Sequence, residues 1–251
     1  MKLQHVHKLD TEQPLSDMQV NMSNSLTRSA HGLSLAEKRI IAACIAKTDQ
    51  MPNMNQVRQR GAWLVRLSAA DYAQTFDVNM NTAYEQLHDA SKNLFKRYIR
   101  TTRKTRKGIE EYEFRWVGGV RYHKGEGWVE LDWWHEVVPH LFGLRTEFTK
   151  YKLSQASALR SGYSWRFFEL LQSWQDTGRY QPIIEDFCLA MDVPEKYTKD
   201  FGVLRRRVIE PAVAELIEKN NMLITWTTQN AGRKVIGLDF KFKSNPQQSL
   251  L

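Results

Sequence analysis

DYAQTFDV at residues 71–78 has a counterpart in DFCLAMDV at residues 186–193. Both stretches begin with an acidic residue followed by an aromatic one, and both end in Asp-Val after a largely apolar middle. A pattern that recurs within one chain, with the same order of flanking elements, indicates a duplicated structural unit. The elements around each copy therefore decide the fold.

Three helices are expected around the first copy, over about residues 34–47, 68–77 and 82–98. Each range begins with Ser or Thr and carries an acidic residue three positions later, which is a helix-start pattern. Apolar residues then recur at helical spacing. The second and third ranges predict two helices joined by a tight turn, the arrangement of a helix-turn-helix motif.

Strand patterns follow these helices. Residues 112–116 and 129–133 each place large apolar side chains on one face of a strand, and glycines between them mark a connection. We expect these two strands to pair as a hairpin. A helix, a helix-turn-helix and a hairpin, in that order, are the elements of a winged-helix domain.

The second copy has the same order of elements. An apolar helix is expected over about 164–175 before the copy, and a long helix over about 201–216 after it. Strands over 222–228 and 234–243 then meet across a glycine-containing turn. Pro211 lies inside the long helix, where its ring and its missing N–H predict a bend.

The expected fold class is α+β, with two tandem winged-helix domains, each a helical bundle that contains a helix-turn-helix and carries a β-hairpin wing. The first domain is expected over 31–140 and the second over 141–244. Residues 1–30 are polar and show no apolar period, so they are expected to form a flexible N-terminal arm. Residues 245–251 are expected to be a C-terminal tail.

Charge favours a polyanionic partner. The 251 residues carry 36 Lys and Arg against 28 Asp and Glu, a formal charge of +8. No apolar run is long enough to cross a bilayer and the start lacks a signal-peptide core, so we expect a cytoplasmic protein without membrane contact. Cys44 and Cys188 are expected to be reduced and buried, because each lies in an apolar helical run. Neither has a second Cys nearby, so their spacing excludes a zinc ribbon or a C-x-x-C redox motif.

Candidate DNA contacts gather in the second copy, because the second helix of a helix-turn-helix enters the major groove. Lys199 and Arg206 are seven apart and are expected to share a helix face. Arg205 and Arg207 flank Arg206, and not all three can face the DNA together on an α-helix. The expected wing tip adds Arg233 and Lys234 for the DNA backbone. Solvated surface charge is the alternative use of these side chains.

The first copy offers uncharged hydrogen-bonding groups instead: Asn79, Asn81, Thr82 and Gln86. These groups suit bases or phosphates, although Asn and Thr also occur at helix starts as ordinary caps. A run of eight cations without an acidic residue follows and predicts either a phosphate-binding surface or a solvated loop. The run consists of Lys92, Lys96, Arg97, Arg100, Arg103, Lys104, Arg106 and Lys107.

Catalysis has little support in the sequence. The chain lacks a G-x-x-x-x-G-K-[S/T] segment, so no nucleotide site is expected. His135 and His140 are misaligned on a helix, and neither a metal nor another cofactor is expected. His5 and His7 are similar to the metal-binding pair of rolling-circle nickases, but they lie in a polar terminus without strand signals. We therefore expect a protein that is not an enzyme.

Three segments resemble a known family. LRTEFTKYKL at 144–153, SWRFFELL at 164–171 and FGVLRRRVI at 201–209, followed by Pro211, resemble segments of the iteron-binding plasmid replication initiators of the Rep family. The resemblance spans about residues 33–242.

The resemblance implies a function and a set of partners. It implies two winged-helix domains that bind double-stranded direct repeats of a plasmid origin as a monomer, and an inverted repeat as a repressing homodimer. It also implies host partners, an initiator and a helicase, which fits a chain without an ATP motif. Among the DNA contacts, it implies Arg205, Arg206 and Arg207.

Two other functions stay open at this point. A winged-helix transcription regulator without a replication role would share every DNA-binding feature. A nickase that uses His5 and His7 would cut origin DNA in the presence of Mg²⁺ or Mn²⁺.

Overall fold

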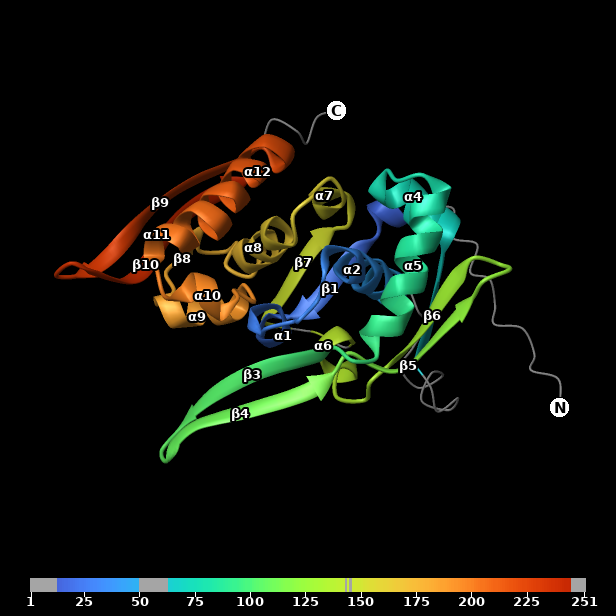
Figure 1. Cartoon of the computed structure of the whole chain (residues 1–251), viewed down its shortest axis with the longest axis horizontal. Helices are drawn as coiled ribbons and strands as arrows, with labels where there is room; N and C mark the ends of the chain where they lie inside the picture. The colour runs from blue at the N-terminus through green and yellow to red at the C-terminus, as the bar shows by residue number, and fades with distance from the viewer. Residues whose placement is uncertain (1–12, 50–62, 143, 145, 245–251) are drawn as a thin grey trace.

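The computed structural model describes residues 13–49, 63–142, 144 and 146–244. Two units lie side by side along the longest axis of the molecule, and the β3–β4 ribbon extends away from the helices (Figure 1). Each unit contains a helix-turn-helix and an antiparallel sheet, so the predicted α+β class with two winged-helix domains is confirmed. Within the described residues, no helix is long and apolar enough to span a bilayer.

The N-terminal segment is packed against the rest of the protein. A 3-10 turn over Leu15–Asp17 precedes β1 (Gln19–Ser23) and α1 (Asn24–Arg28). Strand β1 pairs antiparallel with β7 (Phe148–Lys152). Its alternation of polar and apolar residues buries Val20 and Met22 completely. The expected flexible arm is therefore wrong for residues 13–30, because the five residues of β1 hold only two buried side chains, too short an alternation to stand out among polar neighbours.

The first helix-turn-helix follows the sequence closely. Its elements are α2 (Leu35–Asp49), β2 (Leu64–Ser68), α4 (Ala69–Phe76) and α5 (Met80–Leu94). Ser34 and Glu37 form the expected capping box, in which each backbone N–H donates to the other side chain. Ser68 caps α4, as predicted. The start of α5 was misplaced, because Asn79 and not Thr82 is its cap.

The strands of the first unit pair differently from the prediction. They are β3 (Tyr98–Thr105), β4 (Gly108–Arg115), β5 (Val117–His123) and β6 (Trp128–Trp133). Strand β4 pairs with β3, and β6 lies between β2 and β5. The expected hairpin of 112–116 with 129–133 is therefore wrong. Alternation shows which face of a strand is buried, but it does not identify the partner strand.

The described residues in the middle of the chain form short elements that pack against both units. These elements are α6 (Val138–Leu141), β7, α7 (Ser154–Ser157) and α8 (Gly162–Gln172). Since β7 pairs with β1, a strand from the expected second domain completes a sheet with the N-terminal segment. Helix α8 is almost entirely buried and contacts α1, α12 and β7.

The second unit repeats the plan. It holds β8 (Arg179–Tyr180), α9 (Ile184–Ala190), α10 (Glu195–Thr198), α11 (Phe201–Leu204), a π turn (Arg205–Ile209) and α12 (Glu210–Asn220). The hairpin of β9 (Met222–Ala231) and β10 (Lys234–Ser244) was predicted, and β8 extends it to three strands.

Pro211 explains the π turn. A proline ring clashes with the carbonyl four residues earlier and offers no N–H. Just before it, the N–H of Glu210 bonds to the carbonyl of Arg205, five residues back. The chain thus stays helical through a widened turn, which accommodates the proline where a bend was expected.

Candidate nucleic-acid interface

The first helix-turn-helix has a tight turn. Asp77 ends α4 in the left-handed region with a φ of 49°, and Asn79 caps α5 by accepting a hydrogen bond from the N–H of Thr82 at 2.8 Å. The amide oxygen of Asn79 is therefore used for capping. Asn81, one residue into the helix, is exposed and available for a ligand.

Gln86 has a structural contact. The hydroxyl of Tyr72 on α4 donates to its amide oxygen at 2.6 Å, which joins the two helices of the motif. Thr82 and Gln86 are both half-buried, so they offer less to a DNA ligand than Asn81 does.

The exposed face of α5 includes residues that the sequence analysis did not name. Residues at helical spacing from Asn81 point outward, and this spacing would have found them. They are Tyr84, Glu85, His88 and Asp89, and Lys92 of the cationic run lies on the same face. With two carboxylates and one lysine, this face is not basic.

The cationic run of the first unit divides into different uses. Lys92 and Lys96 are exposed. Arg97 instead makes a bidentate ion pair with the buried Glu37 of the capping box, at 2.9 and 3.0 Å. This pair uses Nε and Nη2 of the half-buried guanidinium and gives Arg97 a structural contact.

The rest of the run lies on a β-ribbon and not in a loop. Strand β3 pairs antiparallel with β4, which is rich in glutamate, and Arg103 lies 3.3 Å from Glu110 on the neighbouring strand. Arg106 and Lys107 form the exposed tip. The acidic partner strand offsets part of the positive charge that the sequence alone predicted.

The second helix-turn-helix ends its first helix as the first motif does. Asp192 lies in the left-handed region with a φ of 52°. Lys199 lies between α10 and α11 and pairs with Glu195 at 2.9 Å. The expected face shared by Lys199 and Arg206 is therefore wrong, because the chain leaves the helix between them and Asp200 caps a new one.

The three consecutive arginines lie on the π turn and are all exposed. Nε of Arg205 donates to Glu210 at 2.6 Å, and its guanidinium lies 6.0 Å from the ring of Trp226. Nε of Arg206 donates to the carbonyl of Gly202 at 3.2 Å, which leaves both terminal nitrogens of its guanidinium for other partners. Arg207 is exposed beside them.

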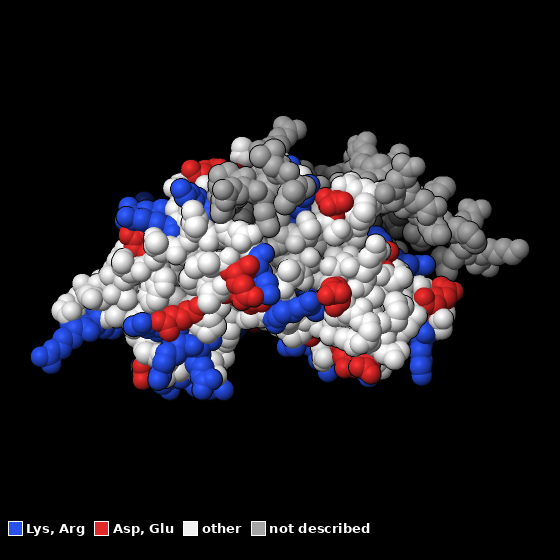
Figure 2. Space-filling view, turned by 90° about the horizontal axis from the view of Figure 1, so that it is seen from above, with Lys and Arg blue, Asp and Glu red and all other residues white. Residues whose placement is uncertain are grey.

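The wing of the second unit reaches outward. Gly232 has a φ of 61°, and Arg233 and Lys234 at the tip are exposed. Seen from above, Lys and Arg gather toward the end of the molecule that holds the β9–β10 hairpin and α9–α12, while elsewhere cations and acidic side chains alternate (Figure 2).

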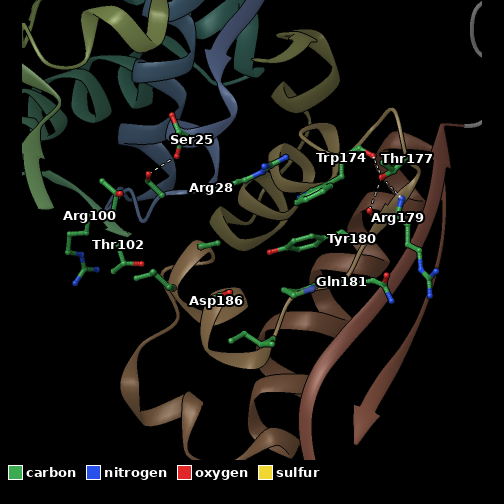
Figure 3. Close-up of a pocket in the computed structure, with 16 residues that line it drawn as sticks. Ser25, Arg28, Arg100, Thr102, Trp174, Thr177, Arg179, Tyr180, Gln181 and Asp186 are labelled. Atoms are coloured by element: carbon green, nitrogen blue, oxygen red, sulfur yellow. Dashed lines mark hydrogen bonds between the residues drawn. The ribbon is translucent and has the colours of Figure 1, made fainter. Parts of the chain in front are cut away.

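A cleft of about 790 Å³ lies between the two units. Arg28, Trp174 and Tyr180 face it from one side, and Arg100 and Thr102 of β3 lie across it (Figure 3). Its arginines have protein partners: Arg28 donates to the carbonyl of Ser173 at 2.8 Å and lies 4.0 Å from the Trp174 ring. Burial lowers the pKa of Arg28.

A buried charged cluster lies behind this cleft. Arg166 of α8 contacts Glu169 at 3.2 Å, and Lys38 contacts Glu169 at 2.6 Å. Burial lowers the pKa of Lys38 to about 8, although Glu169 opposes that shift. His31 lies against both cations, and burial followed by their charges lowers its pKa well below 6.5.

In the described part of the chain, no group of three or more His, Cys, Asp or Glu side chains is placed to hold a metal ion. His5 and His7 lie outside the described residues. Cys44 and Cys188 are buried free thiols, and burial raises the pKa of Cys44 to about 12 and that of Cys188 to about 11.

Two curated proteins and one solved structure are similar to this chain over most of its length. An uncharacterized 27.6 kDa protein of Escherichia coli is 24% identical over 221 residues, 86% of this chain and 92% of that protein. A replication initiation protein of Escherichia coli is 24% identical over 242 residues, 94% of this chain and 73% of that protein. The crystal structure of the Pi initiator protein in complex with iteron DNA has the same fold, with a TM-score of 0.72 and 21% identity over 92% of this chain and 99% of that one.

Family models cover both units. Residues 183–242 match the initiator Rep protein WH2 domain. Residues 19–172 match the initiator replication protein WH1 domain, a span that begins before residue 31 and ends after residue 140, the expected limits of the first domain. Because the WH1 match alone covers more than half of the chain, this protein belongs to the initiator replication protein family.

Proposed function

We propose that this protein starts replication of a plasmid by binding double-stranded repeats at its origin with both helix-turn-helix motifs. The observation that carries the proposal is the second motif, in which a π turn exposes Arg205, Arg206 and Arg207 together. Exposed arginines on the second helix of such a motif suit guanine edges and phosphates of the major groove. The similarity to a protein crystallised with iteron DNA supports the choice of repeated sites.

In this proposal the second unit supplies most of the electrostatic affinity. Arg206 points its free guanidinium nitrogens at the base edges, while Arg205 and Arg207 contact phosphates. The wing residues Arg233 and Lys234 reach the adjacent backbone. Lys199, which pairs with Glu195 on the surface, contributes a phosphate contact when that weak pair opens.

The first unit contributes mainly recognition. Asn81 lies exposed at the start of α5, next to Glu85 and Asp89. Carboxylates are repelled by phosphate but accept hydrogen bonds from the amino group of cytosine. Lys92, Lys96 and the ribbon tip supply phosphate contacts around them. Asn79, Thr82, Gln86 and Arg97 act through the fold of the motif.

The remaining steps need other proteins. Strand opening by a helicase consumes ATP, and the sequence contains no Walker motif. We therefore infer that a host initiator and helicase complete initiation and that the protein is not itself an enzyme. From the resemblance to the plasmid initiators we also propose that a homodimer represses the promoter at an inverted repeat.

The test measures DNA binding and plasmid maintenance separately. The DNA that flanks the coding region is first searched for tandem repeats. Fluorescence anisotropy with such repeats, against scrambled duplexes at several salt concentrations, should show tight and salt-dependent binding to the repeats. Replacing Arg205, Arg206 and Arg207 together by Ala should abolish that preference and the maintenance of an origin plasmid. If the origin plasmid is maintained without the protein, and the protein when present represses the promoter, the transcription regulator would be favoured.

The nickase alternative is tested on the same DNA. We expect no cut in a supercoiled origin plasmid with Mg²⁺ or Mn²⁺, and unchanged binding when His5 and His7 are both replaced by Ala. Metal-dependent nicking that disappears in this double variant would contradict the proposal.

A further inference from the structure

The two helix-turn-helix motifs have the same turn geometry. Asp77 and Asp192 occupy equivalent positions, with φ values of 49° and 52°. The following residue bonds in the same way in each motif: the N–H of Val78 to the carbonyl of Ala73 at 3.1 Å, and the N–H of Val193 to that of Cys188 at 2.9 Å. The backbone of the turn is thus duplicated together with the sequence pattern.

The two carboxylates differ in what they contact. Oδ2 of Asp192 accepts hydrogen bonds from the backbone N–H groups of His31 at 2.7 Å and Gly32 at 3.0 Å. Its Oδ1 lies 3.3 Å from the guanidinium of Arg100 at the base of β3. The turn of the second motif is therefore attached to the first unit at two places.

Asp77 makes no comparable set of contacts among the described residues. Its side chain is 98% exposed and lies 3.7 Å from Arg160. Arg160 holds this turn mainly through the backbone, because it donates to the carbonyl of Phe76 at 3.0 Å. The carboxylate of Asp77 can be removed with little loss of contact, which makes it a matched control for Asp192.

Beneath Asp192 the units are joined by Arg166. Its Nη2 donates to the carbonyls of Thr27 at 3.0 Å and Ser29 at 2.8 Å on one side, and of Ala190 at 2.5 Å on the other. Beside these contacts lies the open cleft, which includes Leu189 and Ala190 of α9 (Figure 3). Asp192 therefore holds the edge of the interface that borders the DNA-binding turn.

We propose that Asp192 is a positioning residue that fixes the orientation of the second helix-turn-helix relative to the first. It thereby sets the distance between the two half-sites of a repeat, one for each motif, at which the protein binds tightly. The inference rests on the proposed binding of repeats by both motifs. An inserted base pair moves one half-site along and around the duplex, since groove positions recur every 10 to 10.5 bp. A rigid pair of motifs then loses one of its contacts, whereas a loosely joined pair follows the DNA.

The experiment compares three variants of the full chain. Asp192→Gly removes the carboxylate but keeps the left-handed turn, which glycine adopts without strain. Asp192→Asn keeps an oxygen that can accept from the two N–H groups, and asparagine tolerates the same backbone. Asp77→Gly is the matched control. Each is titrated by anisotropy against the native repeat and against repeats with two base pairs inserted or removed between the half-sites.

We expect the wild type, Asp77→Gly and Asp192→Asn to lose about tenfold or more in affinity on the altered spacings, because one motif disengages. Asp192→Gly should bind the native repeat more weakly than the wild type does. Its affinity for the repeats with altered spacing should be less than about threefold below its affinity for the native repeat. Thermal unfolding of each variant checks that it is folded. If the affinity of Asp192→Gly falls with altered spacing as steeply as that of the wild type, the inference is overturned and the proposed function stays intact. Failure of the wild type to prefer any repeat would overturn both.

Discussion

Nε of Arg97 donates to Oε2 of Glu37 at 2.9 Å, and Nη2 of Arg97 donates to Oε1 at 3.0 Å. Oε2 of Glu37 also accepts from the N–H of Ser34 at the start of α2. One carboxylate thus caps a helix and holds the base of the β3–β4 ribbon. A residue that the sequence suggested for phosphate contact is in this way part of the fold.

Arg97→Ala should lower the free energy of unfolding by about 1–3 kcal/mol, because Glu37 stays buried without its charged partner. Urea unfolding followed by circular dichroism measures this change. Lys96→Ala is the control: its side chain is exposed, so stability should change by less than about 0.5 kcal/mol while DNA affinity falls equally for all sequences. Unchanged stability in Arg97→Ala would contradict a structural role for the pair.

Arg206→Ala tests the base contact of the second motif. If its guanidinium pairs with a guanine, affinity for the repeat should fall by about 1–3 kcal/mol and the preference at one base position should flatten. Binding to scrambled DNA should weaken far less. A phosphate contact would instead lower the affinities for both duplexes alike. It would also reduce the slope of the logarithm of the binding constant against the logarithm of the salt concentration by about one unit. Equal affinities of wild type and variant on both duplexes would remove Arg206 from the interface.

His31 should make the protein sensitive to acid. Its Nε2 lies 2.8 Å from the carbonyl of Leu26, and its Nδ1 lies 3.2 Å from Lys38 and 3.1 Å from Arg166. This arrangement fits a neutral ring that donates from Nε2 and accepts at Nδ1. Burial and the two cations therefore hold the pKa well below 6.5.

Below pH 6.5 the unfolded chain takes up a proton at His31 that the folded protein does not. Stability should therefore fall with falling pH, by at most about 1.4 kcal/mol per pH unit from this group. Comparing the wild type with His31→Gln cancels the other groups: their difference in unfolding free energy should be constant above pH 7 and shift in favour of the variant below it. A constant difference down to pH 5 would show that His31 titrates normally.

Met22→Ala tests the packing of the N-terminal strand. Met22 is fully buried in β1, so its truncation should lower the free energy of unfolding by about 2–5 kcal/mol. Lys150→Ala, on the paired strand β7 but exposed, should change it by less than about 0.5 kcal/mol. Thermal unfolding measures both. Equal midpoints for the two variants would restore the view of this segment as a loose arm.

The sequence alone predicted the features that depend on near neighbours. The recurring DYAQTFDV and DFCLAMDV stretches located both helix-turn-helix motifs, and Ser34 with Glu37 and Ser68 with Asp71 located the helix starts. The same local signals missed the π turn, since a proline in a helix predicts a defect but not its form.

Tertiary structure decided which distant groups meet. The pairing of β6 with β2 and β5, the place of β1 beside β7, and the contacts of Arg97 with Glu37 and Asp192 with His31 follow no local pattern. Periodicity shows which side of a strand or helix is buried, because burial repeats with the geometry of the element itself. It carries no information on which surface covers that side, and a charged side chain in a sequence looks the same whether it later faces a phosphate or a buried carboxylate. Those choices arise only when the packed chain brings residues far apart in sequence to within a few ångströms of each other.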